Sequence, residues 1–498
     1  MLQVNISPEM LVGSFEVHPL VDYINKVAPK PSDIYSCSPN GWMYKKDEMG
    51  ILPKEVQKVF KQRKALRKEQ LTANNNAEII EKIVQEKIAN GDVSGRGNKE
   101  GEFNLVKEFT ESDIESLHEL SVDALDYLEG RCRAVSKTKN TGQLNRKILI
   151  NSAYGAMANK YFRYMDNRNA SAVTTFGQLV IQWAERKINE HLNKIIKTKD
   201  VAYVFYIDTD SVYVDVDRLI DNIGINKFKD TNHMVDFLDK FAKEKVEPML
   251  EKAFVELSEY MNNKESYMNM DREVIAMADI KSDGLGAIWT GKKRYALNVY
   301  DNEGVRYATP QLKIMGIETQ RSSTPKIVGR GLQESIRVML QEGITPLQQY
   351  VEDYRNHFLL NYREIDYKEL ASVSSANNLE KYGDEDLMPQ KGCPGHIKGA
   401  LAYNRIVRDR NVGTPLREGM KIMQLDLNVS NPFKSDRIAW ESGENIPYEL
   451  TDILDHVDYM KVLNKHFFPS LKRLTDAGGF SYEYEAVEGF DMFNEMFF

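Results

Sequence analysis

Residues 201–216 read Val201-Ala202-Tyr203-Val204-Phe205-Tyr206-Ile207-Asp208-Thr209-Asp210-Ser211-Val212-Tyr213-Val214-Asp215-Val216. Two runs rich in β-branched and aromatic residues flank a short polar turn, a pattern typical of a β-hairpin. Asp208 and Asp210 can then project from the hairpin tip toward the same side. Two adjacent carboxylates favour a positive charge beside them, most often a magnesium ion with oxygen ligands. Acid-x-acid turns also occur as solvated hairpin tips, so the hairpin alone leaves both interpretations open.

Helical patterns precede this hairpin. Pro53 opens a helix that runs to about Val84, and a polar, glycine-rich loop is predicted from Ile88 to Phe109. A second helix follows Glu111-Ser112-Asp113, and a third covers about Leu144 to Asn159. Two long helices joined by a polar tip predict an antiparallel pair.

An amphipathic helix from about Ser171 to Lys197 leads into the hairpin, and the sequence from Glu318 onward is predicted to be mostly helical. The 498 residues provide material for about two to four domains. A content of 42% hydrophobic and 28% charged residues is ordinary for a globular protein. The sequence contains no apolar run of about twenty residues, so no membrane span is predicted.

The start of the chain lacks the features of a signal peptide. Three widely spaced cysteines, Cys37, Cys132 and Cys393, form no disulfide framework, so a reducing cytosol is expected. The formal charge of −8 neither suggests nor excludes nucleic acid, because local clusters of Lys and Arg decide phosphate contact.

One predicted helical face carries Lys147, Asn151 and Tyr154, because spacings of four and seven bring residues to the same side. A cation, an amide and an aromatic ring suit a nucleotide, whereas Ile148 and Leu149 are expected to point toward a core. A half-exposed helix with an incidental polar stripe is the alternative.

Two groups of cations could contact phosphates. Arg63 and Arg67 continue the apolar stripe of the first helix, although the surrounding segment is basic on all sides and could be a solvated face. Arginine offers a bidentate fork to phosphate oxygens. Gly291-Lys292-Lys293-Arg294-Tyr295 nearly spells a phosphate loop with Gly286, but Lys293 stands where a hydroxyl is needed. Consecutive cations before a tyrosine fit a nucleic-acid backbone better.

A further acid, Glu273, begins a strand-like run, where a surface acid is the ordinary interpretation. The basic helix, the Lys-x3-Asn-x2-Tyr-Gly helix, the Asp-Thr-Asp-Ser hairpin and Lys-Lys-Arg-Tyr occur in that order. Together they resemble a family B DNA polymerase, most closely those of T-even-like bacteriophages, over Val4 to the C-terminus. The resemblance implies an α+β fold with an antiparallel palm sheet, helical fingers and a mostly helical thumb.

The resemblance implies these domains: partial palm 1–49, fingers 50–160, palm 161–316, thumb 317–489 and a sliding-clamp-binding tail 490–498. In such polymerases the palm holds two Mg²⁺ ions about 4 Å apart, which act on the primer 3′-hydroxyl and the leaving pyrophosphate. Asp210 is then a metal ligand, Asp208 tunes the coordination, and Glu273 is a nearby third acid.

The same resemblance implies the remaining roles. Lys147, Arg63 and Arg67 would grip the triphosphate of the incoming dNTP, with Asn151 adjoining, and Tyr154 would pack under the nascent base pair. Lys292, Lys293, Arg294 and Tyr295 would hold primer-template DNA, with Lys293 reaching toward the metal site as a catalytic residue. Phe490, Met492 and Phe493 are similar to a sliding-clamp peptide, although an aromatic tail could dock on its own thumb.

The family's Asp-x-x-Ser-Leu-Tyr-Pro-Ser motif, which carries its other metal-binding acid, does not occur. The N-terminal and exonuclease domains are expected to be absent too. We therefore expect the C-terminal part of a split polymerase, completed by a partner chain through an obligate interface and working in the cytoplasm of an infected bacterium. A non-catalytic primer-template and clamp tether, or an inactive remnant, is the alternative.

One residue departs from the family pattern. Ile207 stands where the family usually has glycine, and a β-branched residue resists positive φ. The geometry of the turn is therefore expected to differ slightly, which bears on the placement of Asp208.

Overall fold

The computed structural model describes residues 1–480. The chain divides into two compact units. Unit 1 comprises residues 1–275 and 299–310, and unit 2 comprises residues 276–298 and 311–498. The fold combines helices with small antiparallel sheets, as expected. None of the helices within residues 1–480 is both long and apolar enough to cross a membrane.

Unit 1 begins with a three-stranded antiparallel sheet in the order β1-β3-β2. Its strands are β1 (Leu11–Ser14), β2 (Ser36–Ser38) and β3 (Trp42–Tyr44), with the short helix α1 (Leu20–Ile24) between the first two. The inward side chains of this region pack on α5 (Asn167–Ile196) and α8 (Glu247–Tyr260) to form one hydrophobic core. That core also receives the base of the β4–β5 hairpin.

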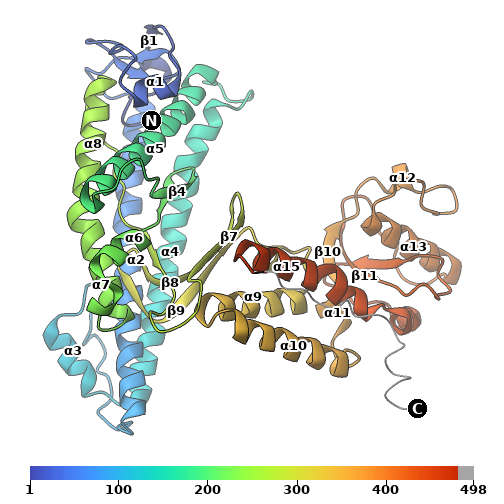
Figure 1. Cartoon of the computed structure of the whole chain (residues 1–498). Helices are drawn as coiled ribbons and strands as arrows, with labels where there is room; N and C mark the ends of the chain where they lie inside the picture. The colour runs from blue at the N-terminus through green and yellow to red at the C-terminus, as the bar shows by residue number, and fades with distance from the viewer. Residues whose placement is uncertain (481–498) are drawn as a thin grey trace. The chain divides into compact units, whose positions relative to one another are not determined.

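Two long helices dominate the next part of unit 1 (Figure 1), namely α2 (Ile51–Ala89) and α4 (Val122–Met157). They run antiparallel, because Gln62 contacts Arg146, Glu69 contacts Lys139 and Glu78 contacts Arg133. The predicted antiparallel pair is therefore confirmed, and the segment between Ala89 and Thr110 contains no helix.

The second predicted helix is present, and one predicted helix bound in this part, the start of the third helix, was wrong. The second helix is α3 (Glu111–His118), which is only eight residues long and begins with a capping box between Thr110 and Asp113. The third helix starts at Val122 rather than near Leu144, with Ser121 as its N-cap. The sequence pattern missed its first half because the buried stripe includes the polar residues Ser136 and Gln143.

The expected hairpin is present in unit 1. Strand β4 (Val204–Asp208) pairs antiparallel with β5 (Ser211–Val214), and Asp208 lies opposite Ser211. Helices α6 (Asp217–Ile223) and α7 (Thr231–Phe241) follow, and a π-helical turn leads into α8.

A four-stranded sheet has the order β6-β8-β7, with β9 also paired to β8. Its strands are β6 (Val274–Ala276), β7 (Ala287–Gly291), β8 (Arg294–Asn302) and β9 (Val305–Met315).

Unit 2 is helical around one large hydrophobic core. Its helices are α9 (Lys326–Gln341), α10 (Ile344–Asn361), α11 (Tyr367–Leu370), α12 (Leu379–Tyr382), α13 (Gly395–Arg410), α14 (Tyr459–Val462) and α15 (Phe468–Ala477). A three-stranded antiparallel sheet of β10 (Ser372–Ser375), β11 (Lys421–Asp426) and β12 (Arg437–Glu441) also contributes, although the sequence analysis did not predict it.

Candidate active site

The two acids of the hairpin lie at its tip. Asp208 ends β4 and is half-buried, whereas Asp210 belongs to the two-residue loop and is exposed. The N–H of Asp210 donates to the carbonyl of Asp208 at 2.6 Å, and the Thr209 hydroxyl donates to the Asp208 carboxylate at 2.9 Å. Because the loop interrupts the alternation of the strand, the projection of both carboxylates to one side stays a prediction.

The positive φ of this turn falls on Thr209, at 58°, and not on Ile207. Ile207 lies within the strand opposite Val212 and packs against the core of unit 1. Ile207 therefore needs no positive φ, because a β-branched residue suits an extended, half-buried strand position, and the expected difference from the family's turn stays a prediction. The strain is carried by Thr209, since only glycine and a few polar residues adopt this conformation readily.

The donor set at the tip fits part of a magnesium site. No group of three or more His, Cys, Asp or Glu side chains within the described residues is placed to hold a metal ion. Magnesium is usually bound by one or two carboxylates, with waters and substrate phosphates filling the other positions. Asp208 and Asp210 could supply those carboxylates.

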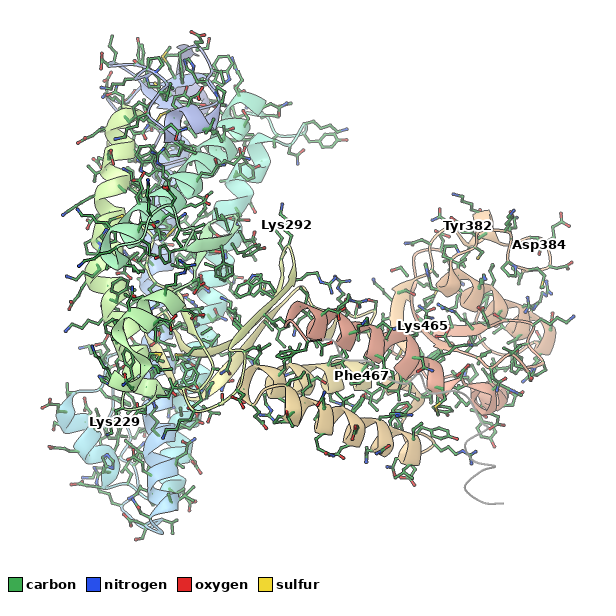
Figure 2. All side chains as sticks on the ribbon, viewed as in Figure 1. Lys229, Lys292, Tyr382, Asp384, Lys465 and Phe467 are labelled. Carbon is green, nitrogen blue, oxygen red and sulfur yellow. The ribbon has the colours of Figure 1, made fainter. Side chains whose placement is uncertain are left out.

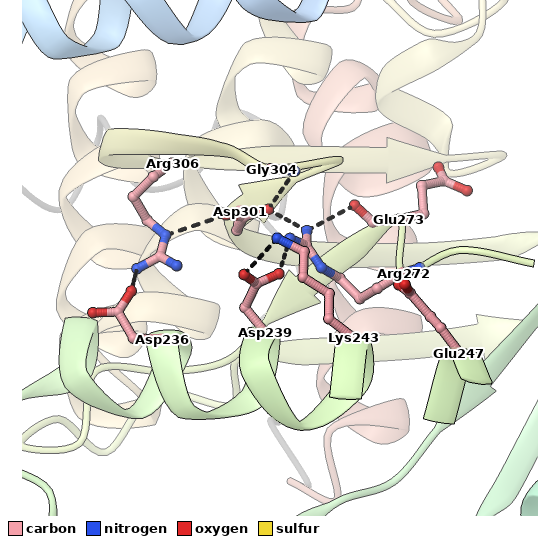
Figure 3. A network of polar contacts seen from close by, with 9 residues as sticks. All are labelled: Asp236, Asp239, Lys243, Glu247, Arg272, Glu273, Asp301, Gly304 and Arg306. Carbon is pink, nitrogen blue, oxygen red and sulfur yellow. Dashed lines mark hydrogen bonds and ion pairs between the residues drawn. The ribbon is translucent and has the colours of Figure 1, made fainter. Parts of the chain in front are cut away.

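Glu273 lies just before β6 within unit 1. Its backbone carbonyl accepts hydrogen bonds from the N–H of Glu303 at 2.6 Å and from Arg272 at 3.3 Å. Arg272 itself is buried, with 8% of its side chain exposed, and is ion-paired with Asp301 and Asp239. Figure 3 shows this network around the strand. The backbone of Glu273 is therefore hydrogen-bonded to this polar cluster.

The charge of that cluster is balanced. Burial alone would raise the pKa of Asp239, but hydrogen bonds from Lys243 and Arg272 hold this pKa below its ordinary value. Arg306 joins Asp301 at 3.3 Å and Asp236 at 2.8 Å. The sequence analysis did not find these partners, because they lie on elements far apart in the chain.

The helix pair brings the predicted nucleotide-binding cations to one place. Arg63 on α2 donates to Gln143 on α4 at 3.3 Å, and Gln143 stands one helical turn before Lys147. Lys147, Asn151 and Tyr154 are exposed on α4, as a ligand-facing helix surface requires. Ile148 and Leu149 are also exposed, at 64% and 57%, so the expectation that they face a core was wrong within the described residues.

The remaining nucleotide-binding candidate, Arg67, already contacts other side chains of the protein. Arg67 forms an ion pair with Glu303 and also donates to Gln70. Its side chain is 27% exposed and that of Glu303 is 29% exposed. Glu303 was not a sequence candidate, because its turn lies 236 residues beyond Arg67.

In unit 2, Lys292 and Lys293 form the two-residue loop between β7 and β8, and both are exposed. The side chain of Lys292 projects from the tip of this hairpin (Figure 2). Arg294 pairs with Glu318 at 2.6 Å, and Tyr295 is only 5% exposed and stacks on Trp289. The two lysines thus lie on the exposed tip, whereas Arg294 and Tyr295 support the hairpin.

Unit 2 also contains a cationic cavity of about 380 Å³ that the sequence analysis missed. Its lining includes Arg321, Arg437, Lys465 and Arg473, together with several hydroxyl groups. Two carboxylates, Glu318 and Asp426, partly neutralise these cations. Burial lowers the pKa of His466, and neighbouring Lys465 lowers it further.

Comparisons with known proteins agree with the motifs. Residues 131–270 match DNA polymerase family B. The chain is 48% identical over 493 residues to a DNA-directed DNA polymerase of Escherichia phage RB69, covering 99% of this chain and 53% of that protein. It is 47% identical over 485 residues to a DNA-directed DNA polymerase of Enterobacteria phage T4, covering 97% of this chain and 53% of that protein. The chain therefore spans about half the length of these relatives.

A solved structure of the family B DNA polymerase from the hyperthermophilic archaeon Pyrobaculum calidifontis is also similar. The TM-score is 0.41 at 15% sequence identity, over 97% of this chain and 43% of that chain. Clamp-binding candidates Phe490, Met492 and Phe493 lie outside the described residues.

Proposed function

We propose that this chain is part of a template-directed DNA polymerase that adds deoxynucleotides to a primer 3′-hydroxyl. The observation that carries the proposal is the identity of 47–48% to two phage DNA-directed DNA polymerases over nearly the whole chain. The arrangement within unit 1 supports it, since one helix pair carries Arg63 and Lys147 and the tip of the β4–β5 hairpin carries two carboxylates. Both relatives are phage proteins, so the proposed place of action is the cytoplasm of an infected bacterium.

Each residue then has a defined task. Asp208 and Asp210 would hold magnesium, and Glu273 would be a third acid near them. When bound, magnesium supplies a Lewis acid for the primer hydroxyl and for the leaving pyrophosphate. Arg63, Arg67 and Lys147 would bind the triphosphate, Asn151 would adjoin it, and Tyr154 would support the nascent base pair. The bidentate fork of arginine matches phosphate oxygens, whereas Lys147 offers a point charge.

DNA contact is proposed for two groups of cations in unit 2. Lys292 and Lys293 are exposed at a hairpin tip. A second set of cations, which includes Lys465, lines the cavity of unit 2. Figure 2 labels Lys292 and Lys465. Cations of this kind bind the DNA backbone without reading sequence. The predicted division into palm, fingers and thumb and the clamp-binding tail belong to the same proposal.

Primer extension in magnesium tests the proposal. The resemblance assigns one further carboxylate to sequence outside these residues, so the assay is run with and without a polypeptide that carries the remaining half of the relatives' length. Extension that requires this second polypeptide would match the split arrangement. Asp210→Asn should abolish extension, whereas Asp221→Asn, an exposed acid on α6, should retain it.

The alternative is a non-catalytic tether for primer-template DNA, which the cationic cavity of unit 2 would also serve. Such a tether predicts DNA binding without extension in either mixture. Extension that survives Asp210→Asn would contradict the assignment of the metal ligands.

A further inference from the structure

The turn between β8 and β9 holds an unusual residue. Glu303 has φ 52° and Gly304 has φ 86°, and together they form the two-residue loop between Asn302 and Val305. Two positive φ angles suit a type I′ turn, in which asparagine and glycine are the favoured residues. A glutamate in this position carries strain, and strain of this kind concentrates at functional sites.

The carboxylate of Glu303 occupies one edge of the Arg67 guanidinium. Arg67 Nε donates to Glu303 Oε2 at 3.1 Å, and Arg67 Nη2 pairs with Glu303 Oε1. On its other side, the backbone N–H of Glu303 donates to the carbonyl of Glu273. Glu303 therefore connects a proposed triphosphate-binding residue to the segment that carries the proposed third acid.

The turn has little freedom to follow Arg67. Asp301 accepts a hydrogen bond from the N–H of Gly304 at 2.9 Å and is paired with the buried guanidinium of Arg272 (Figure 3). The backbone N–H of Arg272 donates in turn to Glu247 at 2.9 Å. The Asp301 side chain is only 3% exposed, so the contacts that hold the turn lie inside the protein.

We propose that Glu303 is a positioning residue that competes with the triphosphate for Arg67. The inference rests on the proposed function. The Nε–Nη2 edge of a guanidinium binds one carboxylate or one phosphate in bidentate fashion, but not both at once. Because Glu303 is held by its turn, nucleotide binding through this edge must separate the Arg67–Glu303 pair. The pair then keeps α2 in a nucleotide-free arrangement and lowers the affinity for dNTP.

The test is the dissociation constant of the complementary dNTP, measured with a dideoxy-terminated primer-template and magnesium in the assembly that extends primers. Glu303→Gln removes the charge, keeps the shape and should tighten dNTP binding by about twofold to fivefold, in the range of partly exposed charged pairs. Glu244→Gln, which alters an exposed acid paired with Lys240, should leave the constant unchanged. Arg67→Ala should weaken binding, and adding Glu303→Gln to it should give no further gain.

Each result decides the proposal. Weaker or equal binding by Glu303→Gln would overturn it, as would a gain that persists beside Arg67→Ala. A purely structural role of the turn would lower the melting temperature of Glu303→Gln without tightening dNTP binding. If the unaltered assembly extends primers but the Glu303→Gln assembly binds dNTP no more tightly, only this inference fails. If the unaltered assembly extends no primer, the proposed function itself fails.

Discussion

Replacement of Arg272 by methionine should destabilise unit 1 around the β8–β9 turn. Arg272 has only 8% of its side chain exposed and neutralises Asp301 and Asp239, which are 3% and 20% exposed. Removing one partner of a buried ion pair costs about 3–5 kcal/mol, because the other charge stays buried. Asp301 keeps Arg306 and the N–H of Gly304, so we expect the lower end, about 3 kcal/mol.

Hydrogen exchange in peptides that cover residues 299–310 and α7 provides the measurement. A loss of about 3 kcal/mol corresponds to about a hundredfold faster exchange in amides that open together. Arg131→Met serves as the control, since Arg131 is exposed and donates to Tyr127, and its loss should stay within about 0.5 kcal/mol.

A double variant separates the ion pair from simple loss of packing. Arg272→Met with Asp301→Asn removes the uncompensated carboxylate and should recover about 1 kcal/mol of the loss, as coupled neighbours do. If Arg272→Met costs less than about 1 kcal/mol, the reasoning from buried charge is refuted. The reasoning would also be refuted if Arg272→Met lowered the free energy of unfolding by the same amount with and without Asp301→Asn.

Two further predictions concern unit 2. Gly331→Ala in α9 should destabilise by about 1–3 kcal/mol in urea unfolding, because its Cβ would lie 2.5 Å from the ring of Tyr354, which is hydrogen-bonded to Ile327. Gly329→Ala in the same helix meets nothing nearer than 3.9 Å and should stabilise by about 0.5–1 kcal/mol, so equal effects would contradict the packing argument. Burial lowers the pKa of His466 in the folded state, so the unfolded state binds a proton at a higher pH. The free energy of unfolding should therefore decrease as the pH falls below the ordinary histidine pKa. His466→Gln should flatten this loss in urea titrations, and an unchanged slope would count against it.

The helices and the hairpin that have a regular pattern of apolar residues could be predicted from the sequence. Helix α2, the second half of α4, helix α5 and the β4–β5 hairpin follow from patterns that each lie within a few tens of residues. The short strands of the β10-β11-β12 sheet could not be predicted, because each contains six or fewer residues and lies among helical segments. Tertiary pairing, and not local propensity, stabilises such strands.

The candidate site divides in the same way. Spacing along one helix placed Lys147, Asn151 and Tyr154 on one face, and all three are exposed. Burial was harder to predict, since Ile148 and Leu149 are exposed and Tyr295 is covered. An amphipathic pattern shows which residues share a face, but only the neighbouring elements decide whether that face is covered.

By itself, the sequence determined the types of the main elements, the acid pair at the hairpin tip and the helical face with its cation, amide and ring. These depend on the chemistry of residues that are close in the chain. The tertiary structure decided that Arg67 pairs with Glu303 and that Arg272 is enclosed by Asp239 and Asp301. Such contacts join residues 29 to 236 positions apart, and they form only where folding removes charged groups from water and leaves each with a partner.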